Sequence, residues 1–506
     1  MNTALQLFAI IVYMVFMLVI GVFYSKKASS SSKDFYLGGR SLGPWVVALS
    51  AEASDMSGWL LMGLPGVAYW IGLADATWTS IGLAIGTYVN WLIVAKRLRN
   101  YSQVAGDSIT VPQFLSNRFK EKRKYIQVIA ALLCVIFFGV YAASCFVTCG
   151  KLFGTLFGFN YHSMMVIGAI LVLAYTWFGG YLAVSVTSFF QAIIMILTLI
   201  LVLVIGVNHA GGIENVLTNA KSIPGFWSLV ANASPNAGGT FNEAVPYGAL
   251  SIASCLAWGF GYFGLPPVLI RFMSIRDASE IGRARKIATI WVLISMAAAV
   301  FIGILGRALY PNLEILNSSA NAEKVLIVIS QNLLPALLTG FACAGILAAT
   351  MSSADSYLLI TSSALIEDIY KIIKKDIPEN FAMLLSRAAL VIVAICSIII
   401  AWNENSVIFT IVSFAWAGLG ASFGPVMLCS LFWRRTTYAG ALCGIVAGGL
   451  SVFVWKFLIK PLGGVFGIYE LLPAFFIGLF VIIIVSLITK EPSSDITDEF
   501  DKVANM

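Results

Sequence analysis

Apolar segments of about 20 residues, long enough to cross a bilayer as a helix, recur along the whole chain. Such a helix can enter hydrocarbon because it bonds all of its own backbone groups. Apolar side chains make up 59% of the 506 residues and charged ones 11%. Soluble domains are about 45–50% apolar and about 25% charged. We therefore expect an all-α integral membrane protein.

Thirteen such segments predict thirteen transmembrane helices. Their expected limits are 4–24, 44–68, 72–95, 125–153, 161–179, 183–207, 245–271, 285–308, 336–363, 383–401, 406–433, 437–458 and 468–489. Lysine and arginine gather in alternate connections, notably in 25–43, 96–124 and 276–286. Since basic connections stay on the cytoplasmic side, the pattern predicts an N-terminus outside and a C-terminus inside. One membrane domain is expected over 1–490, followed by a short acidic cytoplasmic tail over 491–506.

A polar stretch, Ala53–Gly58, interrupts the second apolar segment. It contains Asp55, two serines and a glycine between apolar flanks. A carboxylate at this depth is costly unless it is paired or hydrated, and it therefore suggests a functional site. Small and hydroxylated residues also let a helix open where its backbone lines a cavity. We interpret the stretch as a break in the helix at mid-membrane, as in sites that hold an ion and a solute. An ordinary interrupted helix with Asp55 facing a neighbour is the alternative.

A second interrupted segment lies five spans later, within 245–271. Both segments close on the same three residues, at Gly63–Pro65 and Gly264–Pro266. Five is an odd number, so the two segments would have opposite orientations, as in transporters built from inverted repeats. A string of three residues can also recur by chance.

Two hydroxyls, Ser352 and Ser353, lie among small residues in the span 336–363. Hydroxyl and carbonyl oxygens suit a hard cation such as Na⁺. Carbonyls freed by an opened segment at 53–56 would complete an all-oxygen site for sodium. The alternative is close helix packing, with each serine bonded to the carbonyl four residues before it.

Cysteine and histidine give no sign of an enzyme. All eight cysteines fall inside predicted spans, where we expect them to act as small buried apolar residues, and none has metal-ligand spacing. The two histidines, His162 and His209, lie near span ends. Catalysis within the membrane would need a nucleophile and base or a metal cluster at depth, so we expect no enzyme and no cofactor. A nutrient sensor is the alternative from another class, although 491–506 is too short for a signalling domain.

Two connections contain signals for short helices. In 96–124, Thr110 followed by Pro112 predicts a helix start, because proline is favoured in the first turn. In 309–335, Ala322–Leu334 could lie on the outer surface as an amphipathic helix.

Five motifs together resemble those of the sodium:solute symporter family, over residues 36 to about 490. They are GGRSLGP (38–44), LSAEASDMSGWLLMGLPG (49–66), WGFGYFGLPPVLIRFM (258–273), ILAATMSSADS (346–356) and SSALIEDIYK (362–371). The resemblance implies a 5+5 inverted repeat of the amino-acid-transporter type, with spans 2–6 and 7–11 as its halves. It also implies sodium-coupled import of a small amino acid, with L-proline expected, by alternating access in a bacterial plasma membrane. A monomer that binds solute, sodium and lipid but no nucleic acid is expected.

The resemblance also implies which residues bind. The expected sodium ligands are the carbonyls of Ala53, Met56 and Ala349 and the hydroxyls of Ser352 and Ser353. The expected solute contacts are Asp55, Gly58, Trp59, Tyr141, Trp258, Tyr262 and Pro266, and Arg40 and Ser57 are expected to act in coupling. Half-helix amino ends attract a proline carboxylate, whereas aromatic faces suit its ring and its cationic nitrogen.

Some positions depart from the family pattern. Ser188 stands where related symporters often have an acid, which leaves the number of sodium ions open. Leu265–Pro267 replaces a Gln and a Pro-His of the proline carriers, so another amino acid or a monocarboxylate stays an alternative. Glu52 and Asp355 are further intramembrane acids. Asp355 either tunes ion affinity or pairs with a base, and together with Asp55 it keeps proton coupling open.

Overall fold

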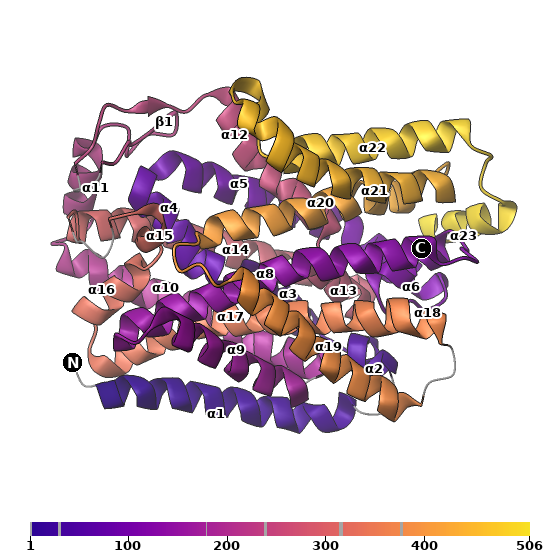
Figure 1. Ribbon diagram of the computed structural model, residues 1–506, viewed down its shortest axis with the longest axis horizontal. Coiled ribbons are helices and arrows are strands. Elements are labelled where there is room, and N and C mark those ends of the chain that lie inside the picture. The colour runs from indigo at the N-terminus through magenta and orange to yellow at the C-terminus, as the bar shows by residue number, and fades with distance from the viewer. Residues whose placement is uncertain (1–2, 29–31, 179, 237–239, 313–316, 375–377) are drawn as a thin grey trace.

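Long helices lying along one common direction make up the computed structural model (Figure 1). It describes residues 3–28, 32–178, 180–236, 240–312, 317–374 and 378–506. Helix α1 (Thr3–Ala28) lies along one edge of the bundle, and α21 (Tyr438–Val454) and α22 (Leu471–Ile488) lie along the opposite edge. The all-helical prediction is confirmed.

Ten helices in the described part are long and apolar enough to cross a membrane. They contain α1, α5 (Leu73–Val89) with α6 (Ala95–Val104), α8 (Tyr125–Phe157), α10 (Tyr181–His209), α14 (Ile281–Leu309), α17 (Ala336–Leu365), α19 (Glu379–Ile400), α20 (Ile408–Phe432), α21 and α22. A bent pair, Ala249–Gly264 and Pro266–Ser274, counts as an eleventh if it is a single span. The number thirteen stays a prediction.

The two remaining predicted spans coincide with a broken helix and a shorter one. The broken helix consists of α3 (Pro44–Gly58), a π-helical turn (Trp59–Gly63) and α4 (Leu64–Ile71). The shorter one is α9 (Tyr161–Phe178). A continuous apolar run is the signal that hydropathy detects, so a polar break hides the first of these spans from a test of length and composition.

The second break predicted from the sequence is present in the bent pair. Its first half consists of α12 (Ala249–Leu256) and a 3₁₀ segment, Ala257–Gly264, and its second half is α13 (Pro266–Ser274). The halves meet at 44°. Leu265 is extended at the junction, as expected for a residue before proline.

The connections differ from the predictions in one respect. Helix α7 (Val111–Arg118) begins as predicted, and the Thr110 hydroxyl caps it by accepting the Gln113 N–H at 3.0 Å. The predicted surface helix is wrong, because α16 (Val325–Leu333) is buried from Val325 to Ser330. Its run Val-Leu-Ile-Val-Ile is apolar all round, and such a helix is buried rather than amphipathic.

Small elements complete the two ends of the bundle. On the side of α4 lie α11 (Ile213–Ser222), α15 (Ser319–Ala322) and an antiparallel pair of β1 (Ala231–Asn232) and β2 (Val245–Pro246). At the opposite end of the bundle, α23 (Ser494–Ala504) packs against α6 (Figure 1).

Six of the eight cysteines are buried as expected. The expectation is wrong for Cys396 and Cys443, which are exposed on α19 and α21.

Candidate functional site

The break in α3 lies at Ser57, inside the polar stretch 53–58 that predicts it and directly after the segment 53–56 from which freed carbonyls are expected. Ser57 has a φ of 48°, in the left-handed region that a serine rarely adopts. In a regular helix the Trp59 N–H would bond to the carbonyl of Asp55, but here it donates to the carbonyls of Met56 and Ser57. The Ser57 hydroxyl accepts from the same N–H at 3.2 Å. The break therefore releases the Asp55 carbonyl from its usual helical partner.

Two tyrosines from other helices bond to that released carbonyl. The Tyr141 hydroxyl of α8 donates to the Asp55 carbonyl at 3.0 Å, and the Tyr357 hydroxyl of α17 donates to it at 3.3 Å. Their rings lie 4.3 Å apart, and both are buried. The broken segment is thus tied to α8 and α17 through its backbone.

The predicted sodium ligands are all buried where α3 meets α17. They are Ala53, Met56, Ala349, Ser352 and Ser353. The Ser353 hydroxyl donates to the Ala53 carbonyl at 3.3 Å, which brings two of them together. The Ser352 hydroxyl donates to that of Ser188 on α10 at 2.8 Å. The residue that replaces the family's acid therefore lies beside a predicted ligand.

Aromatic rings gather on the side of the break that faces α4. The rings of Trp59 and Trp258 lie 5.5 Å apart, and Phe409 of α20 lies 5.7 Å and 5.2 Å from them. Tyr469 stacks on Trp258 at 5.4 Å. Phe409 and Tyr469 are not predicted from the sequence, because a single aromatic residue among apolar residues carries no positional signal. Four rings from different elements thus form an apolar wall suited to a small ring.

Three buried polar groups beside this wall lack a hydrogen-bond partner in the described part of the chain. They are one carboxyl oxygen of Asp55, the indole N–H of Trp59 and the hydroxyl of Tyr262. Tyr262 meets Trp416 edge-on at 5.1 Å, and its hydroxyl lies near the Asp55 carboxyl. Buried polar groups are normally bonded, so one acceptor and two donors left over at one place suggest a polar ligand.

Two predicted solute residues have different surroundings. A Cβ on Gly58 would lie 2.4 Å from the Thr148 hydroxyl, so Gly58 allows α3 to approach α8 closely. Pro266 begins α13 and lines a separate small cavity with Arg271. The structure therefore brings Asp55, Trp59 and Tyr262 together but gives Gly58 a packing role.

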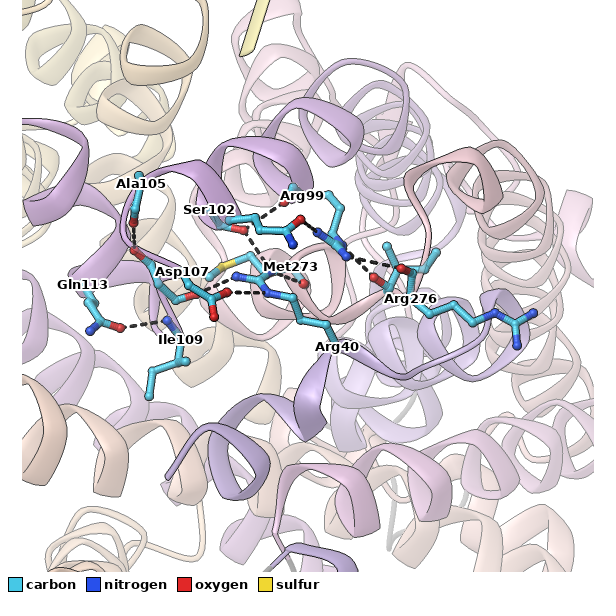
Figure 2. Close-up of polar contacts among 12 residues, drawn as sticks. Arg40, Arg99, Ser102, Ala105, Asp107, Ile109, Gln113, Met273 and Arg276 are labelled. Atoms are coloured by element: carbon cyan, nitrogen blue, oxygen red, sulfur yellow. Dashed lines mark hydrogen bonds and ion pairs between the residues drawn. The ribbon is translucent and has the colours of Figure 1, made fainter. Parts of the chain in front are cut away.

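Arg40 joins three parts of the chain at the end of the bundle where α6 leads into α7 (Figure 2). Its Nε donates to the Asp107 carboxylate at 3.1 Å, and one Nη donates to the Ser102 hydroxyl at 3.0 Å and to the Met273 carbonyl. The other Nη donates to the Ser108 carbonyl at 3.0 Å. Arg40 therefore connects the segment before α3 to the α6–α7 connection and to the end of α13.

Burial, and after it the nearby Arg99, lower the pKa of Arg40. An arginine stays charged in a protein even so, and the carboxylate of Asp107 supplies the opposite charge. Arg99 makes a parallel set of contacts, since its Nε donates to the Ile275 carbonyl at 2.6 Å (Figure 2). Two arginines thus fix the C-terminal end of α13 to α6 and its following loop.

The two additional acids bond to uncharged groups. Glu52 accepts from the Trp91 indole at 3.3 Å, and Asp355 accepts from the Thr176 hydroxyl. Each keeps a second oxygen without a partner among the described residues. Asp355 forms no ion pair with a lysine or arginine in that part of the chain, which gives no support to the alternative in which it pairs with a base.

A buried ion pair fixes the start of α20, which carries Phe409 of the aromatic wall. Lys151 of α8 lies 2.6 Å from the Glu323 carboxylate, and both side chains are almost fully buried. Glu323 also accepts the N–H groups of Ile408 and Phe409 at 3.0 Å each. No pattern in the sequence pairs these two residues, because one lies in a span and the other in a connection 172 residues away.

Comparison with known proteins supports the resemblance seen in the motifs. A profile of the sodium:solute symporter family matches residues 35–448. The "Sodium/proline symporter 2" of Staphylococcus saprophyticus is 42% identical over 501 residues, covering 98% of this chain and 95% of that protein. The "Sodium/proline symporter" of Staphylococcus aureus is 41% identical over 505 residues, with the same coverage.

Solved structures share the fold at low sequence identity. A Na⁺-coupled sialic acid symporter in a substrate-bound outward-open state superposes with a TM-score of 0.78 at 18% identity, over 97% of this chain and 99% of its own. MhsT in complex with L-phenylalanine superposes with a TM-score of 0.53 at 16% identity, over 87% and 97%. At these identities the likeness speaks for the fold alone.

Proposed function

Because the chain belongs to the sodium:solute symporter family, we propose that it imports L-proline together with sodium by alternating access. It is a multi-pass membrane protein and a transporter rather than an enzyme. The observation that carries the proposal is the break at Ser57, where a buried acid and unpartnered donors face an aromatic wall. Relatives called sodium/proline symporters, 41–42% identical over nearly the whole chain, support the choice of solute.

Sodium would bind between α3 and α17. Its proposed ligands are the carbonyls of Ala53, Met56 and Ala349 and the hydroxyls of Ser352 and Ser353. The hydrogen bond between Ser353 and the Ala53 carbonyl supports this, because it brings one proposed ligand oxygen of each helix to 3.3 Å from the other. Sodium would then strengthen the contact between the broken helix and α17, which couples ion binding to the shape of the solute site.

Proline would bind against the aromatic wall. Its ring suits the faces of Trp59 and Trp258, and its cationic nitrogen suits the free oxygen of Asp55. Its carboxylate would accept from the two donors without partners, the Trp59 indole and the Tyr262 hydroxyl. Tyr141 would act by holding the Asp55 backbone, and Gly58 by letting α8 approach. Pro266 would contact solute only on its way inward.

Arg40 and Ser57 would serve coupling from two places. Ser57 forms the break itself, so its conformation sets which carbonyls point toward the ion. Arg40 would close the end of the bundle where α6 leads into α7, because it binds the α6–α7 connection to α13. Helix α13 follows the segment that carries Tyr262. Opening toward the cytoplasm would require these bonds to break.

The finer architecture is part of the same proposal. We infer thirteen spans with the N-terminus outside and the C-terminus inside, one transporter domain over 1–490, and a cytoplasmic tail over 491–506. Spans 2–6 and 7–11 would form the inverted repeat, which is supported by one break in each half, at Ser57 and at Leu265. A monomer in the lipid bilayer would be sufficient for transport.

The test is uptake of labelled proline into vesicles of purified protein, with and without an inward sodium gradient. We expect accumulation that depends on sodium and not on a proton gradient alone. Unlabelled amino acids and monocarboxylates as competitors would identify another solute. Uptake that is indifferent to sodium would reject the proposal.

Two variants test the site itself. Asp55→Asn should lower sodium affinity and uptake together, and Ser353→Ala should weaken sodium binding by at least tenfold. Ser362→Ala is the matched control, because Ser362 is a buried serine of the same helix whose hydroxyl also donates to a carbonyl, that of Ser386 at 2.9 Å. Normal transport by Asp55→Asn would place the solute elsewhere.

A further inference from the structure

A small cavity lies between the central site and the connection that Arg40 holds. Its accessible volume is about 20 Å³, room for about one water molecule. The connection before α7 and the start of that helix form one wall, from Ile109 to Pro112. Arg271 of α13 and Asp368, in the π-helical turn Ile366–Tyr370 that follows α17, both line it.

Arg271 is a buried cation whose hydrogen bonds go to uncharged groups. One Nη donates to the Pro267 carbonyl and the other to the Ser356 hydroxyl, each at 3.0 Å. Its Nε has no hydrogen-bond partner, and no carboxylate forms an ion pair with it within the described ranges. Its guanidinium lies 5.5 Å from the centre of the Tyr181 ring, another residue of the cavity wall.

Asp368 is a buried acid that forms no ion pair with a lysine or arginine among the described residues. One of its oxygens accepts from the Thr110 hydroxyl and from the Gln127 amide, each at 2.8 Å. Its other oxygen has no partner among the residues that the structure describes. The side chain is buried to about the same degree as that of Arg271. One cavity is therefore lined by an arginine and a carboxyl group, neither of which forms an ion pair in the described part of the chain.

We propose that this cavity is an inner transit site for the amino-acid zwitterion, with its carboxylate on Arg271 and its cationic nitrogen on Asp368. Burying a charge without a partner is costly, and a zwitterion would supply the missing opposite charge to both groups at once. A purely anionic or purely cationic ligand would satisfy one and repel the other. This proposal rests on the function proposed above.

The same helices connect the two sites. Ser356 follows Ser352 by one turn of α17, and Pro266 follows Tyr262 by four residues across the second break. A solute leaving the aromatic wall toward the loops therefore meets Arg271 next. The path is apolar between these polar groups, since Ile270, Leu359 and Ile360 also line the cavity.

The cavity must widen before it can hold proline. The α6–α7 connection forms part of its wall. Among the contacts that hold this connection, Arg40 bonds to the Asp107 carboxylate and to the Ser108 carbonyl, and Thr110 bonds to Asp368. If the connection moves away, Asp368 loses the Thr110 hydroxyl and gains room for a cationic nitrogen. Release of the wall and binding at the inner site are thus linked through one carboxylate.

The experiment measures the KM for labelled proline from each face, with full-length protein in right-side-out and inside-out vesicles. Arg271→Gln and Asp368→Asn should each raise the KM on the cytoplasmic face at least tenfold while changing the outer KM less than twofold. Arg271→Lys, which keeps the charge, should restore most of the cytoplasmic affinity and also covers the case in which Arg271→Gln fails to fold.

Arg307→Gln is the matched control. Arg307 is equally buried, donates to the carbonyls of Tyr69 and Pro311, and lies against an aromatic ring at 4.0 Å, but at the far end of α14. It should change neither KM. Equal KM changes on both faces, or no change in Arg271→Gln and Asp368→Asn, would overturn the inner site while leaving sodium-driven proline uptake by the wild type intact. Wild-type vesicles that accumulate no proline would instead overturn the proposed function, and this site with it.

Discussion

The two tyrosines that hold the Asp55 carbonyl should show strong non-additivity when they are mutated together. Tyr141→Phe or Tyr357→Phe alone removes one donor and leaves the carbonyl bonded to the other, at 3.3 Å or 3.0 Å. A single hydrogen bond contributes about 0.5–1.5 kcal/mol, so each single variant should lose about 1 kcal/mol of the free energy of unfolding. The rings stay in place, because phenylalanine keeps their contact at 4.3 Å.

The double variant leaves the carbonyl buried without either tyrosine. An unsatisfied buried acceptor costs about 1–3 kcal/mol, so we expect the double variant to lose about 1 kcal/mol more than the sum of the singles. The assay is unfolding by SDS in mixed micelles, with and without sodium, for all four proteins of the cycle. For mutations at independent sites, the losses in the free energy of unfolding add within about 0.3–0.5 kcal/mol. Losses that add within that range would refute the idea that both hydroxyls serve one released carbonyl.

Further predictions concern packing and the tail. Gly58→Ala should lower the free energy of unfolding by about 1–3 kcal/mol through overpacking, because the added Cβ would lie 2.4–3.0 Å from Thr148 atoms. Adding Thr148→Ala should recover part of this loss. Equal melting temperatures for Gly58→Ala and wild type would contradict the prediction. A hydrogen bond from Arg434 lowers the pKa of Asp501 below 3.8 when α23 is docked. The contact is therefore complete above pH 3.8 and is lost as the pH falls through the lowered value. Lys120 also pairs with Asp495 and Glu499 of α23, and the pKa of Asp495 is lowered as well. Spin labels on α23 and α6 should therefore show greater separation in acid, and Arg434→Gln should reduce that pH dependence; an unchanged distance in wild type would contradict the prediction.

Much of the fold could be predicted because hydrocarbon imposes a simple length rule. Apolar runs gave the long helices, and the polar stretch in the second run located the break to within a few residues. Thr110 gave the start of α7 because capping is local chemistry. The buried position of α16 was misjudged, since only the packing of neighbouring helices decides whether a short apolar helix lies on a surface or inside.

The site was predictable only where motifs carried it. Asp55, Trp59 and Tyr262 lie in stretches that are unusual for a membrane helix, whereas Phe409 and Tyr469 lie in ordinary apolar sequence. Their proximity to Trp258 results from the tertiary fold. The same holds for Lys151 with Glu323 and for Arg271 with Asp368, because single charges far apart in the chain do not reveal a shared location.

The distribution of thiols makes this protein convenient for chemical labelling. The reactive species of a cysteine is the thiolate, which forms in water and not in hydrocarbon. Six native cysteines are enclosed by the protein, and Cys396 and Cys443 project from the outer sides of membrane helices, where acyl chains would surround them. Water-soluble maleimides should therefore leave the natural protein unmodified in vesicles, and probes can be attached at introduced cysteines without first replacing the native ones.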